Sequence, residues 1–308
     1  MPYFSIIIPL YNKEKYIKNT LKSVLEQSFT DFEVIVINDG STDQSVAVVE
    51  KIKDPRIRLI HQENQGVSVA RNKGIELAKA SCISFLDADD YWYPQFLETF
   101  YQLIQKYPEQ AVFSAAFEVE TKWGTFLSKY SIDSNEQDLV VDFFEASLKE
   151  CVLWTSCLVI KKEVFDRVGT FDSTIKISQD LDLWIRIGIA YPIVFTHRCL
   201  AIYKHDDNSL SKKTNDLRDR LHFEKFEAIE GNHPTLKKYL DLNRYAVAMH
   251  CKLNSDHKNH QKLRKDLQLS NLPVRKQILL YCPRPILLLL LNFQNLLIRL
   301  GLRRSVFK

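Results

Sequence analysis

Residues 83–93 read I-S-F-L-D-A-D-D-Y-W-Y, an apolar run followed by three carboxylates within four positions. The run favours a buried strand, and Asp87, Asp89 and Asp90 follow at its carboxyl end. Open α/β sheets bind their ligands beyond the carboxyl ends of their strands. Taken alone, however, such acids are more typical of a solvated turn or of a helix N-terminus than of a binding site. The surrounding sequence is therefore needed to distinguish a ligand-binding site from a solvated turn.

The first third of the chain alternates strand-like and helix-like segments. Apolar runs rich in β-branched residues predict strands at Ser5–Leu10, Phe32–Asn38, Ile57–His61 and Cys82–Leu86. Helical spacing predicts helices at Asn12–Gln27, Val67–Lys79 and Pro94–Tyr107, and Ser41 or Thr42 is expected to cap a further helix. Nearly continuous apolar strands that alternate with helices predict an α/β fold with a mainly parallel sheet flanked by helices.

The remainder of the chain has a more mixed pattern. Strands are expected at Ala111–Val119, Leu153–Ile160 and Ala201–His205, and a helix with an acidic first turn at Ser178–Ala190. From about Asp216 onward the pattern is almost entirely helical. The segment 207–217 is polar and rich in turn-forming residues. We therefore expect one domain over residues 1–210 and a helical region over residues 211–308.

Composition narrows the class of protein. With 45% hydrophobic and 26% charged residues, the 308-residue chain is typical of a soluble globular protein. A net charge of +4 is too small to indicate a nucleic-acid partner. The six scattered cysteines form no CxxC pair, which indicates a reducing compartment rather than a zinc site or a disulfide framework. The N-terminus lacks the basic region of a signal peptide, so we expect a cytoplasmic protein.

Six sequence blocks, taken in order, resemble the family 2 glycosyltransferases with a GT-A fold. They read I-I-I-P-L-Y-N, E-V-I-V-I-N-D-G-S-T-D, N-Q-G-V-S-V-A-R-N-K-G, I-S-F-L-D-A-D-D, Q-D-L-D-L-W-I-R and Y-K-H-D-D-N-S-L-S. The blocks span about residues 4–211 and leave the C-terminal third uncovered. The resemblance implies a Rossmann-like GT-A domain that binds a nucleotide sugar over residues 1–210, followed by a helical C-terminal extension.

The resemblance also implies which residues bind the donor. Asp39 is similar to the family's uracil-binding acid, which accepts a hydrogen bond from the base. Gln179 stands where the family usually has a glutamate, and its amide can still hydrogen bond through both oxygen and nitrogen. The other residues implied in nucleotide or donor binding are Pro9, Tyr11, Glu14, Asn64 and Arg71.

Asp87-Ala88-Asp89 resembles the family's D-x-D motif. The resemblance implies that Asp87 touches the ribose or the metal, and that Asp89 is a direct ligand of Mn²⁺ or Mg²⁺. His205 is similar to a histidine that joins the metal site, and Lys204 replaces a more usual arginine at the diphosphate. Asp90 has no assigned role and is left as a helix cap, a partner of the ligands or an acceptor contact.

Asp180 resembles the family's catalytic base. A carboxylate at a helix start can take the proton of an acceptor hydroxyl. The acceptor oxygen then attacks the anomeric carbon of the donor from the back, which inverts the configuration of that carbon. The processive Q-x-x-R-W signature is absent, because residues 184–188 read W-I-R-I-G, so we expect one sugar per encounter. The change to Gln179 favours an altered sugar specificity. A catalytically impaired, nucleotide-sugar-binding homologue that acts as a scaffold is the alternative.

These features imply an inverting, metal-assisted hexosyl- or N-acetylhexosaminyl-transferase. The donor is expected to be a nucleotide-diphosphate sugar, most simply a UDP-sugar. The acceptor is expected to be a glycan or a lipid-linked hydroxyl, in polysaccharide or glycoconjugate biosynthesis. A nucleotidyltransferase is discounted, because P-L-Y-N-K-E-K contains no glycine for a phosphate loop.

The C-terminal tail combines an apolar run with basic residues. From Pro273 to Lys308 the chain has seven basic residues and no acids. The run P-I-L-L-L-L-L-N-F-Q-N-L-L-I predicts a helix at about residues 283–304, with an apolar stretch shorter than the ~20 residues that span a bilayer. Either this helix packs on the catalytic domain, or it lies in the interface of an anionic membrane. The second alternative implies a peripheral protein at the inner face of the cell membrane.

Overall fold

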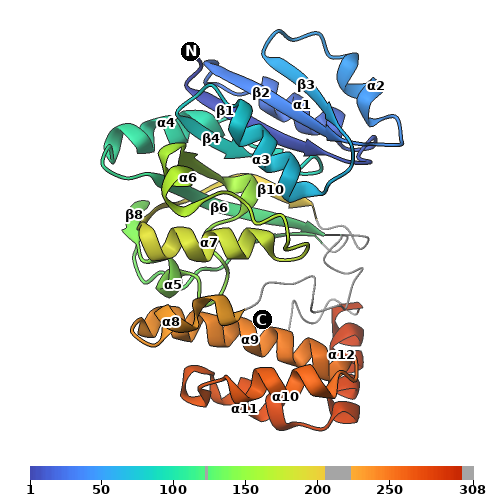
Figure 1. Cartoon of the computed structure of the whole chain (residues 1–308), viewed down its shortest axis with the longest axis vertical. Helices are drawn as coiled ribbons and strands as arrows, with labels where there is room; N and C mark the ends of the chain where they lie inside the picture. Colours follow the sequence, from blue (N-terminus) through green and yellow to red (C-terminus); the bar gives the residue numbers. More distant parts are fainter. Residues whose placement is uncertain (122–123, 205–222, 300–308) are drawn as a thin grey trace. The chain divides into compact units, whose positions relative to one another are not determined.

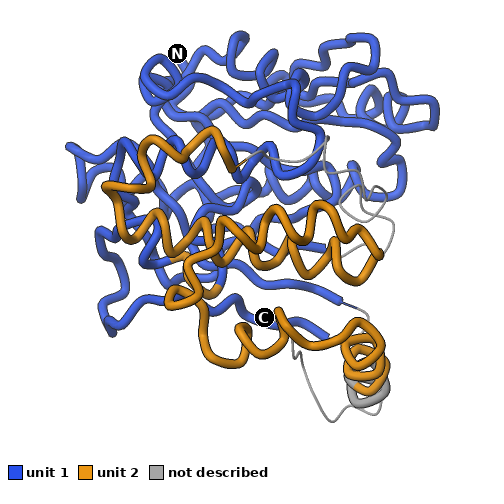
Figure 2. The backbone as a smooth tube through the Cα atoms, turned by 60° about the horizontal axis from the view of Figure 1, so that its bottom comes forward, with its two compact units in different colours: residues 1–146, 150–221 blue, residues 147–149, 222–308 orange. Residues whose placement is uncertain are grey.

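A computed structural model describes residues 1–121, 124–204 and 223–299, with side chains up to residue 293. The chain forms two compact units (Figure 2). Unit 1 comprises residues 1–146 and 150–221, and unit 2 comprises residues 147–149 and 222–308. The boundary predicted after residue 210 falls outside the described residues and stays a prediction.

Within the described residues, unit 1 is built on one ten-stranded sheet (Figure 1). Eight strands follow the order β3-β2-β1-β4-β9-β6-β10-β5, while β7 pairs with β6 and β8 with β10. The strands are β1 (Phe4–Leu10), β2 (Phe32–Asp39), β3 (Ile57–Gln62), β4 (Cys82–Phe85), β5 (Tyr91–Trp92), β6 (Val112–Thr121), β7 (Gly124–Leu127), β8 (Asp138–Val141), β9 (Leu158–Lys161) and β10 (Ile193–Lys204).

The helices of unit 1 lie along this sheet (Figure 1). They are α1 (Ile17–Leu25), α2 (Ser45–Glu50), α3 (Val67–Leu77), α4 (Phe96–Lys106), α5 (Phe143–Ala146), α6 (Glu163–Val168) and α7 (Gln179–Ala190), with a 3-10 turn η1 at Thr155–Cys157.

The predicted α/β architecture is confirmed. β1 pairs in parallel with β2 and β4, and β2 with β3, which gives the predicted parallel arrangement to the first four strands. Ile6 and Ile8 join the apolar cluster that contains Leu21 of α1. Ile7 faces the opposite side, where a Cβ added at Gly74 of α3 would lie 2.3 Å from Ile7 Cγ2. Helices therefore cover both faces of β1.

Beyond β4 the sheet is mixed. β9 runs antiparallel to both β4 and β6, whereas β6 and β10 are parallel. Only the second half of the strand predicted at Leu153–Ile160 is extended, because the 3-10 turn η1 precedes β9. The strand predicted at Ala201–His205 is the end of the much longer β10.

Two helix starts differ from the prediction. The helix predicted from Asn12 begins only at Ile17, because Asn12 has a positive φ of 51° and the chain turns before α1. The predicted caps Ser41 and Thr42 are wrong, since α2 begins at Ser45. There Asp43 Oδ1 accepts the Ser45 N–H at 2.9 Å and satisfies a donor at the start of the helix.

Unit 2 is helical over its described length. Its elements are η4 (Phe223–Phe226), α8 (Glu227–Glu230), α9 (Pro234–Leu253), α10 (His257–Lys265), η5 (Leu269–Asn271), α11 (Val274–Tyr281) and α12 (Arg284–Arg299). Leu280 of α11 and Leu287 of α12 are fully buried in a cluster with Tyr245 and Met249 of α9. No described helix is both long and apolar enough to cross a membrane.

Candidate active site

The carboxyl ends of β1, β2 and β4 border a cleft of about 440 Å³ in unit 1. Parallel strands end at the same edge of a sheet, which is why loops far apart in sequence meet there. The predicted site residues that line the cleft are Pro9, Tyr11, Asp39, Asn64, Arg71, Asp87, Ala88, Asp89 and Gln179. Of the predicted residues that the structure describes, Glu14, Asp180 and Lys204 do not line it.

Asp39 ends β2 as a buried carboxylate that organises the next loop. Its Oδ1 accepts hydrogen bonds from Gln62 Nε2 at 2.7 Å and from the Gln65 N–H at 2.9 Å, and its Oδ2 accepts the Gly66 N–H at 2.9 Å. These bonds fix the segment that carries Asn64 into the cleft. Gly40 follows Asp39 with a φ of +70°, and a Cβ there would lie 2.9 Å from the Asn64 backbone nitrogen. Glycine is therefore required at this turn.

The turn after β1 is fastened to the turn after β2. Asn12 Oδ1 accepts the Thr42 N–H at 2.8 Å, and Glu14 Oε2 accepts the Gln44 N–H at 2.9 Å. Asp43 Oδ2 in turn accepts the Glu14 N–H at 3.0 Å. Glu14 therefore points to the neighbouring loop, and its hydrogen bonds link the turn after β1 to the turn after β2.

Two basic side chains from distant segments face the acids at the end of β4. Arg71 Nη2 of α3 lies 2.6 Å from Asp87 Oδ1, and Lys13 Nζ lies 2.5 Å from Asp89 Oδ2. Burial raises the pKa of the Asp89 carboxyl, and the Lys13 ammonium acts in the opposite direction. The sequence analysis missed Lys13, although its position directly after P-L-Y-N, at the end of a predicted strand, was a signal for it.

Asp90, unassigned from the sequence, is buried behind the cleft. Its carboxylate accepts hydrogen bonds from Ser156 Oγ at 2.6 Å and from the Lys204 N–H at 3.1 Å. Burial and the nearby carboxylates of Asp87 and Asp89 raise its pKa well above the ordinary value. Asp90 therefore ties the acidic loop to the segment before β9 and to the end of β10.

The start of α7 brings Gln179 to the cleft and Asp180 beside it. Ser178 adopts a left-handed conformation with a φ of 65°, which turns the chain into the helix. Asp180 is half-buried, and its Oδ1 accepts the Leu181 N–H at 2.8 Å. Burial raises the pKa of Asp180, the Arg71 guanidinium opposes that shift, and Asp87 adds to it. A carboxyl with a raised pKa beside a cleft is a candidate functional group.

The segment before α7 supplies a wall of the cleft that the sequence did not indicate. Ser173, Ile175 and Lys176 line the cleft. Arg186 of α7 pairs with the buried Asp182 at 2.7 Å. It also donates to the backbone carbonyls of Val168 and Thr170 just before this wall. Trp184 is buried, as expected of a core aromatic residue.

Lys204 lies at the end of β10, with its Nζ 5.3 Å from the centroid of the Tyr16 ring and 6.0 Å from that of Tyr91. His205 lies outside the described residues, so its predicted role stays a prediction. Among the described residues, no group of three or more His, Cys, Asp or Glu side chains is placed to hold a metal ion. The carboxylates of Asp87 and Asp89 nevertheless suit a hard cation that takes its remaining ligands from phosphates and water.

The comparison with known families decides the class of protein. The family model described as "Glycosyl transferase family 2" matches residues 5–169, which include the ends of β1, β2 and β4. The chain belongs to glycosyl transferase family 2. The family identifies the chain as a glycosyltransferase and leaves the sugar open.

Similar curated proteins are named as glycosyltransferases. The chain is 34% identical over 218 residues to an uncharacterized glycosyltransferase of Rickettsia bellii, a match that covers 69% of this chain and 31% of that protein. It is 27% identical over 230 residues to the glycosyltransferase GlyG of Streptococcus pneumoniae, which covers 69% of this chain and 74% of GlyG. A match to YibD of Escherichia coli, 47% identical over 97 residues, covers 31% of this chain and 28% of YibD. The chain thus spans less than a third of the length of two of these relatives.

Solved structures confirm the fold. S. aureus TarS 1–349 in complex with UDP-GlcNAc superposes with a TM-score of 0.62 at 18% identity, over 88% of this chain and 77% of that one. The complex of the same protein with UDP gives a TM-score of 0.59. At this identity the similarity concerns the fold, which is the GT-A arrangement of a sheet flanked by helices.

Proposed function

We propose that this family 2 glycosyltransferase moves a sugar from a UDP-sugar to an acceptor hydroxyl with inversion at the anomeric carbon. The observation that carries the proposal is the cleft, where Asp39 of β2, the Asp87–Asp89 pair that follows β4 and Gln179 of α7 line one space. The TarS structures with UDP and UDP-GlcNAc support a uridine nucleotide as the donor's leaving group.

In this proposal the base and ribose lie at the β1 and β2 end of the cleft. Asp39 and Asn64 would contact the uracil, and the exposed ring of Tyr11 would flank it. The Asp39 carboxylate already accepts the backbone N–H groups of Gln65 and Gly66, so the base would meet a carboxylate whose position is fixed. Fixed donors and acceptors reduce the ordering cost of binding.

The diphosphate lies at the β4 end in the same proposal. Asp87 and Asp89 would hold a divalent cation, Mn²⁺ or Mg²⁺, whose charge neutralises the diphosphate as it leaves. Lys204 and His205 are proposed as further contacts to the metal or diphosphate. Arg71 would hold Asp87 in place through its 2.6 Å ion pair.

Asp180 is proposed as the general base. Its carboxylate takes the proton from the acceptor hydroxyl while the oxygen attacks the anomeric carbon. The new carbon–oxygen bond forms as the bond from that carbon to the β-phosphate oxygen breaks, and the electron pair leaves with UDP. Gln179 would contact hydroxyls of the donor sugar, so its amide is proposed to set sugar specificity.

The test compares Asp180→Asn with Asp166→Asn, which removes an exposed carboxylate from α6. Sugar transfer or donor hydrolysis is measured with a panel of UDP-sugars and Mn²⁺, and UDP binding by calorimetry. We expect Asp180→Asn to lose at least ~100-fold in kcat while UDP binding persists. An active Asp180→Asn protein would contradict the role of Asp180. UDP binding without turnover of any donor would favour the impaired homologue.

We also propose that unit 2 contacts an anionic membrane, where a lipid-linked acceptor would be presented. On α11 the large side chains at Val274, Ile278 and Tyr281 recur every three to four residues and are all exposed. On α12 an equally exposed stripe is formed by Ile286, Leu289, Leu290 and Phe293.

Basic residues accompany these two apolar stripes. Arg275 and Arg284 are exposed beside them, and no acid occurs from Pro273 to the end of the chain. Apolar side chains flanked by arginine are the pattern of an interfacial helix on anionic lipid. Leu280 and Leu287 are buried and pack these helices into unit 2, so packing and the proposed membrane contact use different faces of the two helices.

A further inference from the structure

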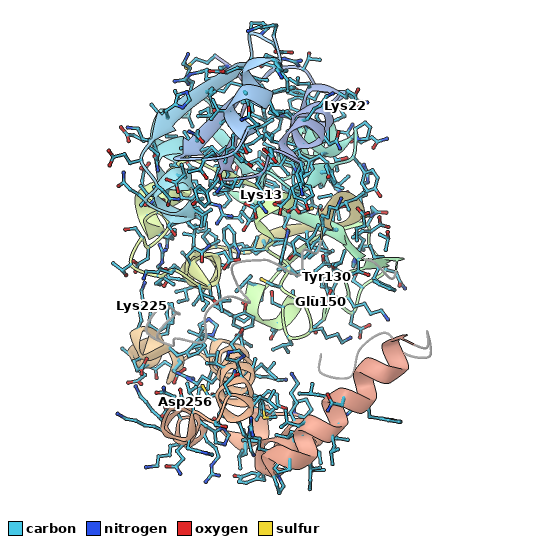
Figure 3. The ribbon with its side chains drawn as sticks, turned by 90° about the vertical axis from the view of Figure 1, so that its right-hand side faces the viewer. Lys13, Lys22, Tyr130, Glu150, Lys225 and Asp256 are labelled. Carbon is cyan, nitrogen blue, oxygen red and sulfur yellow. The ribbon has the colours of Figure 1, made fainter. Side chains whose placement is uncertain are left out.

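Lys13 reaches into the cleft although no motif assigns it a role. Its Nζ lies 2.5 Å from Asp89 Oδ2, and both residues line the cleft. The side chains are 30% and 18% exposed, so the pair is neither sealed from water nor fully solvated. In Figure 3, Lys13 lies among the side chains of unit 1, whereas Lys22 projects from the outside of α1.

The backbone of Lys13 is fixed, and its side chain is the part that can move. The Lys13 N–H donates to Ser45 Oγ at 2.8 Å, and the Lys13 carbonyl accepts the N–H groups of Tyr16 and Ile17 at 2.9 and 3.0 Å. The ammonium sits on a flexible four-carbon stem, which allows it to change partners while its Cα stays in place.

A second ammonium lies near the aromatic ring that Lys13 approaches. Lys13 Nζ is 5.6 Å from the centroid of the Tyr16 ring, and Lys204 Nζ is 5.3 Å from the same centroid. Both distances fall within the range of a cation–π contact. Two cations therefore lie around the Tyr16 ring, and one of them contacts Asp89. Such an arrangement suits an anion of more than one charge.

We propose that Lys13 is a built-in cation that occupies Asp89 before the donor binds and moves to the donor's diphosphate when it binds. Asp89 Oδ2 can serve a divalent cation only after the Lys13 ammonium has left it, because two cations repel at that distance. A diphosphate offers the displaced ammonium a new anionic partner. Lys13 thereby couples metal binding to donor binding. This inference rests on the proposed function, since it needs a diphosphate donor and a cation at Asp89.

The coupling has a measurable consequence in the absence of turnover. Mn²⁺ alone has to displace Lys13 and gains no phosphate ligand, so it binds weakly. With UDP present, the ammonium and the metal both gain phosphate oxygens, and Mn²⁺ binds more tightly. By linkage, Mn²⁺ strengthens UDP binding by the same factor.

The experiment measures Mn²⁺ binding to the full chain from the EPR signal of free Mn²⁺, with and without UDP. The test variant is Lys13→Gln, and the matched control is Lys15→Gln, an exposed lysine of the same turn that does not line the cleft. We expect Lys13→Gln to bind Mn²⁺ alone about tenfold more tightly than the wild type, the scale of one partly buried ion pair. The factor by which UDP strengthens Mn²⁺ binding should then be about tenfold smaller in Lys13→Gln than in the wild type and in Lys15→Gln, because the metal still gains phosphate oxygens but no longer has to displace an ammonium.

Lys13→Arg provides a second variant, because it keeps the cation and should retain the wild-type coupling even if Lys13→Gln folds poorly. Equal Mn²⁺ affinity of Lys13→Gln and wild type would overturn the inference, as would unchanged coupling. Failure of the wild type to bind Mn²⁺ even with UDP would also overturn it. UDP binding by calorimetry without metal distinguishes these results from a failure of the proposed function, which would appear as the absence of UDP binding.

Discussion

Arg71 Nη2 lies 2.6 Å from Asp87 Oδ1, so a residue of α3 holds the carboxyl end of β4. The Arg71 side chain is 5% exposed, and its guanidinium carbon lies 5.2 Å from the centroid of the Phe171 ring. Nε and Nη1 of Arg71 are buried without a hydrogen-bond partner among the described residues. One buried cation therefore joins α3, the acidic loop and the segment before α7.

Substitution of Arg71 should weaken this junction. Arg71→Met leaves Asp87 without its guanidinium partner, and we expect a loss of about 2 kcal/mol in the free energy of unfolding. The two unpaired nitrogens of Arg71, Nε and Nη1, disappear at the same time, which keeps the loss below that of a fully satisfied buried pair. Urea denaturation measures the change.

Arg56→Gln is the matched control, because Arg56 pairs with Asp54 at 2.8 Å near the surface and away from the cleft. Its loss should stay below about 1 kcal/mol. Equal losses in the two variants would show that burial adds nothing to the Arg71–Asp87 pair.

The raised pKa of Asp180 predicts opposite effects of pH on activity and on stability. A general base has to be ionised, so the acid limb of the kcat profile should lie above the ordinary aspartate pKa of about 3.9. The free energy of unfolding should change in the opposite direction, falling as the pH rises. A carboxyl whose pKa is raised by folding stabilises the protein below its unfolded pKa, and this contribution is lost as the pH rises through the folded pKa.

Asp180→Asn removes that ionisation. Relative to the wild type it should gain stability between pH 4 and pH 7, and urea denaturation at several pH values measures the difference. Asp166→Asn serves as the control for the removal of a carboxylate charge from a neighbouring helix. A stability difference between Asp180→Asn and wild type that is constant over this range would contradict the burial of the Asp180 charge.

Much of the fold follows from local sequence. The strands β1, β2 and β3 begin and end within one residue of their predicted limits, because their apolar, β-branched runs leave few alternatives. β1 and β2 are buried on both faces, whereas the edge strand β3 is largely half-buried. β5, β7 and β8 were not predicted. They have two to four residues each and are largely exposed or half-buried, so pairing with β6 and β10 creates them rather than any local pattern.

The site was predictable only in part. Asp39, Asp87 and Asp89 stand at strand ends, where the topology alone brings them together. Lys13 and Arg71, the partners of the acids, are separated from them by 76 and 16 positions, and no local pattern encodes such pairs. The wall at residues 173–176 lies in an irregular loop, whose position depends on the contacts of Arg186.

Gly40 offers a test of how the turn after β2 positions the donor loop. In Gly40→Ala, a Cβ 2.9 Å from the Asn64 nitrogen adds a clash to the strain of a positive φ. We expect a loss of about 2–3 kcal/mol in the free energy of unfolding, with weaker UDP binding because the loop carrying Asn64 is displaced.

The Gly66→Ala variant measures the cost of backbone strain without the steric clash that is expected in Gly40→Ala. Gly66 also has a positive φ, of +93°, but a Cβ there meets nothing within 4 Å. It should therefore lose only about 1 kcal/mol, the cost of the strain alone. A Gly40→Ala protein as stable as Gly66→Ala would show that the loop yields without cost.

The apolar stripes of α11 and α12 predict binding to anionic lipid. Ile278→Ser combined with Leu289→Ser removes one exposed side chain from each helix, and we expect about tenfold or greater loss of binding to vesicles that contain phosphatidylglycerol. Co-sedimentation measures the bound fraction, which should also fall as salt screens Arg275 and Arg284. Leu127→Ser, an exposed position on β7 of unit 1, is the matched control and should bind like the wild type. Unchanged binding of the double variant would contradict a membrane role for these two stripes, and equal binding to purely zwitterionic vesicles would contradict the preference for anionic lipid.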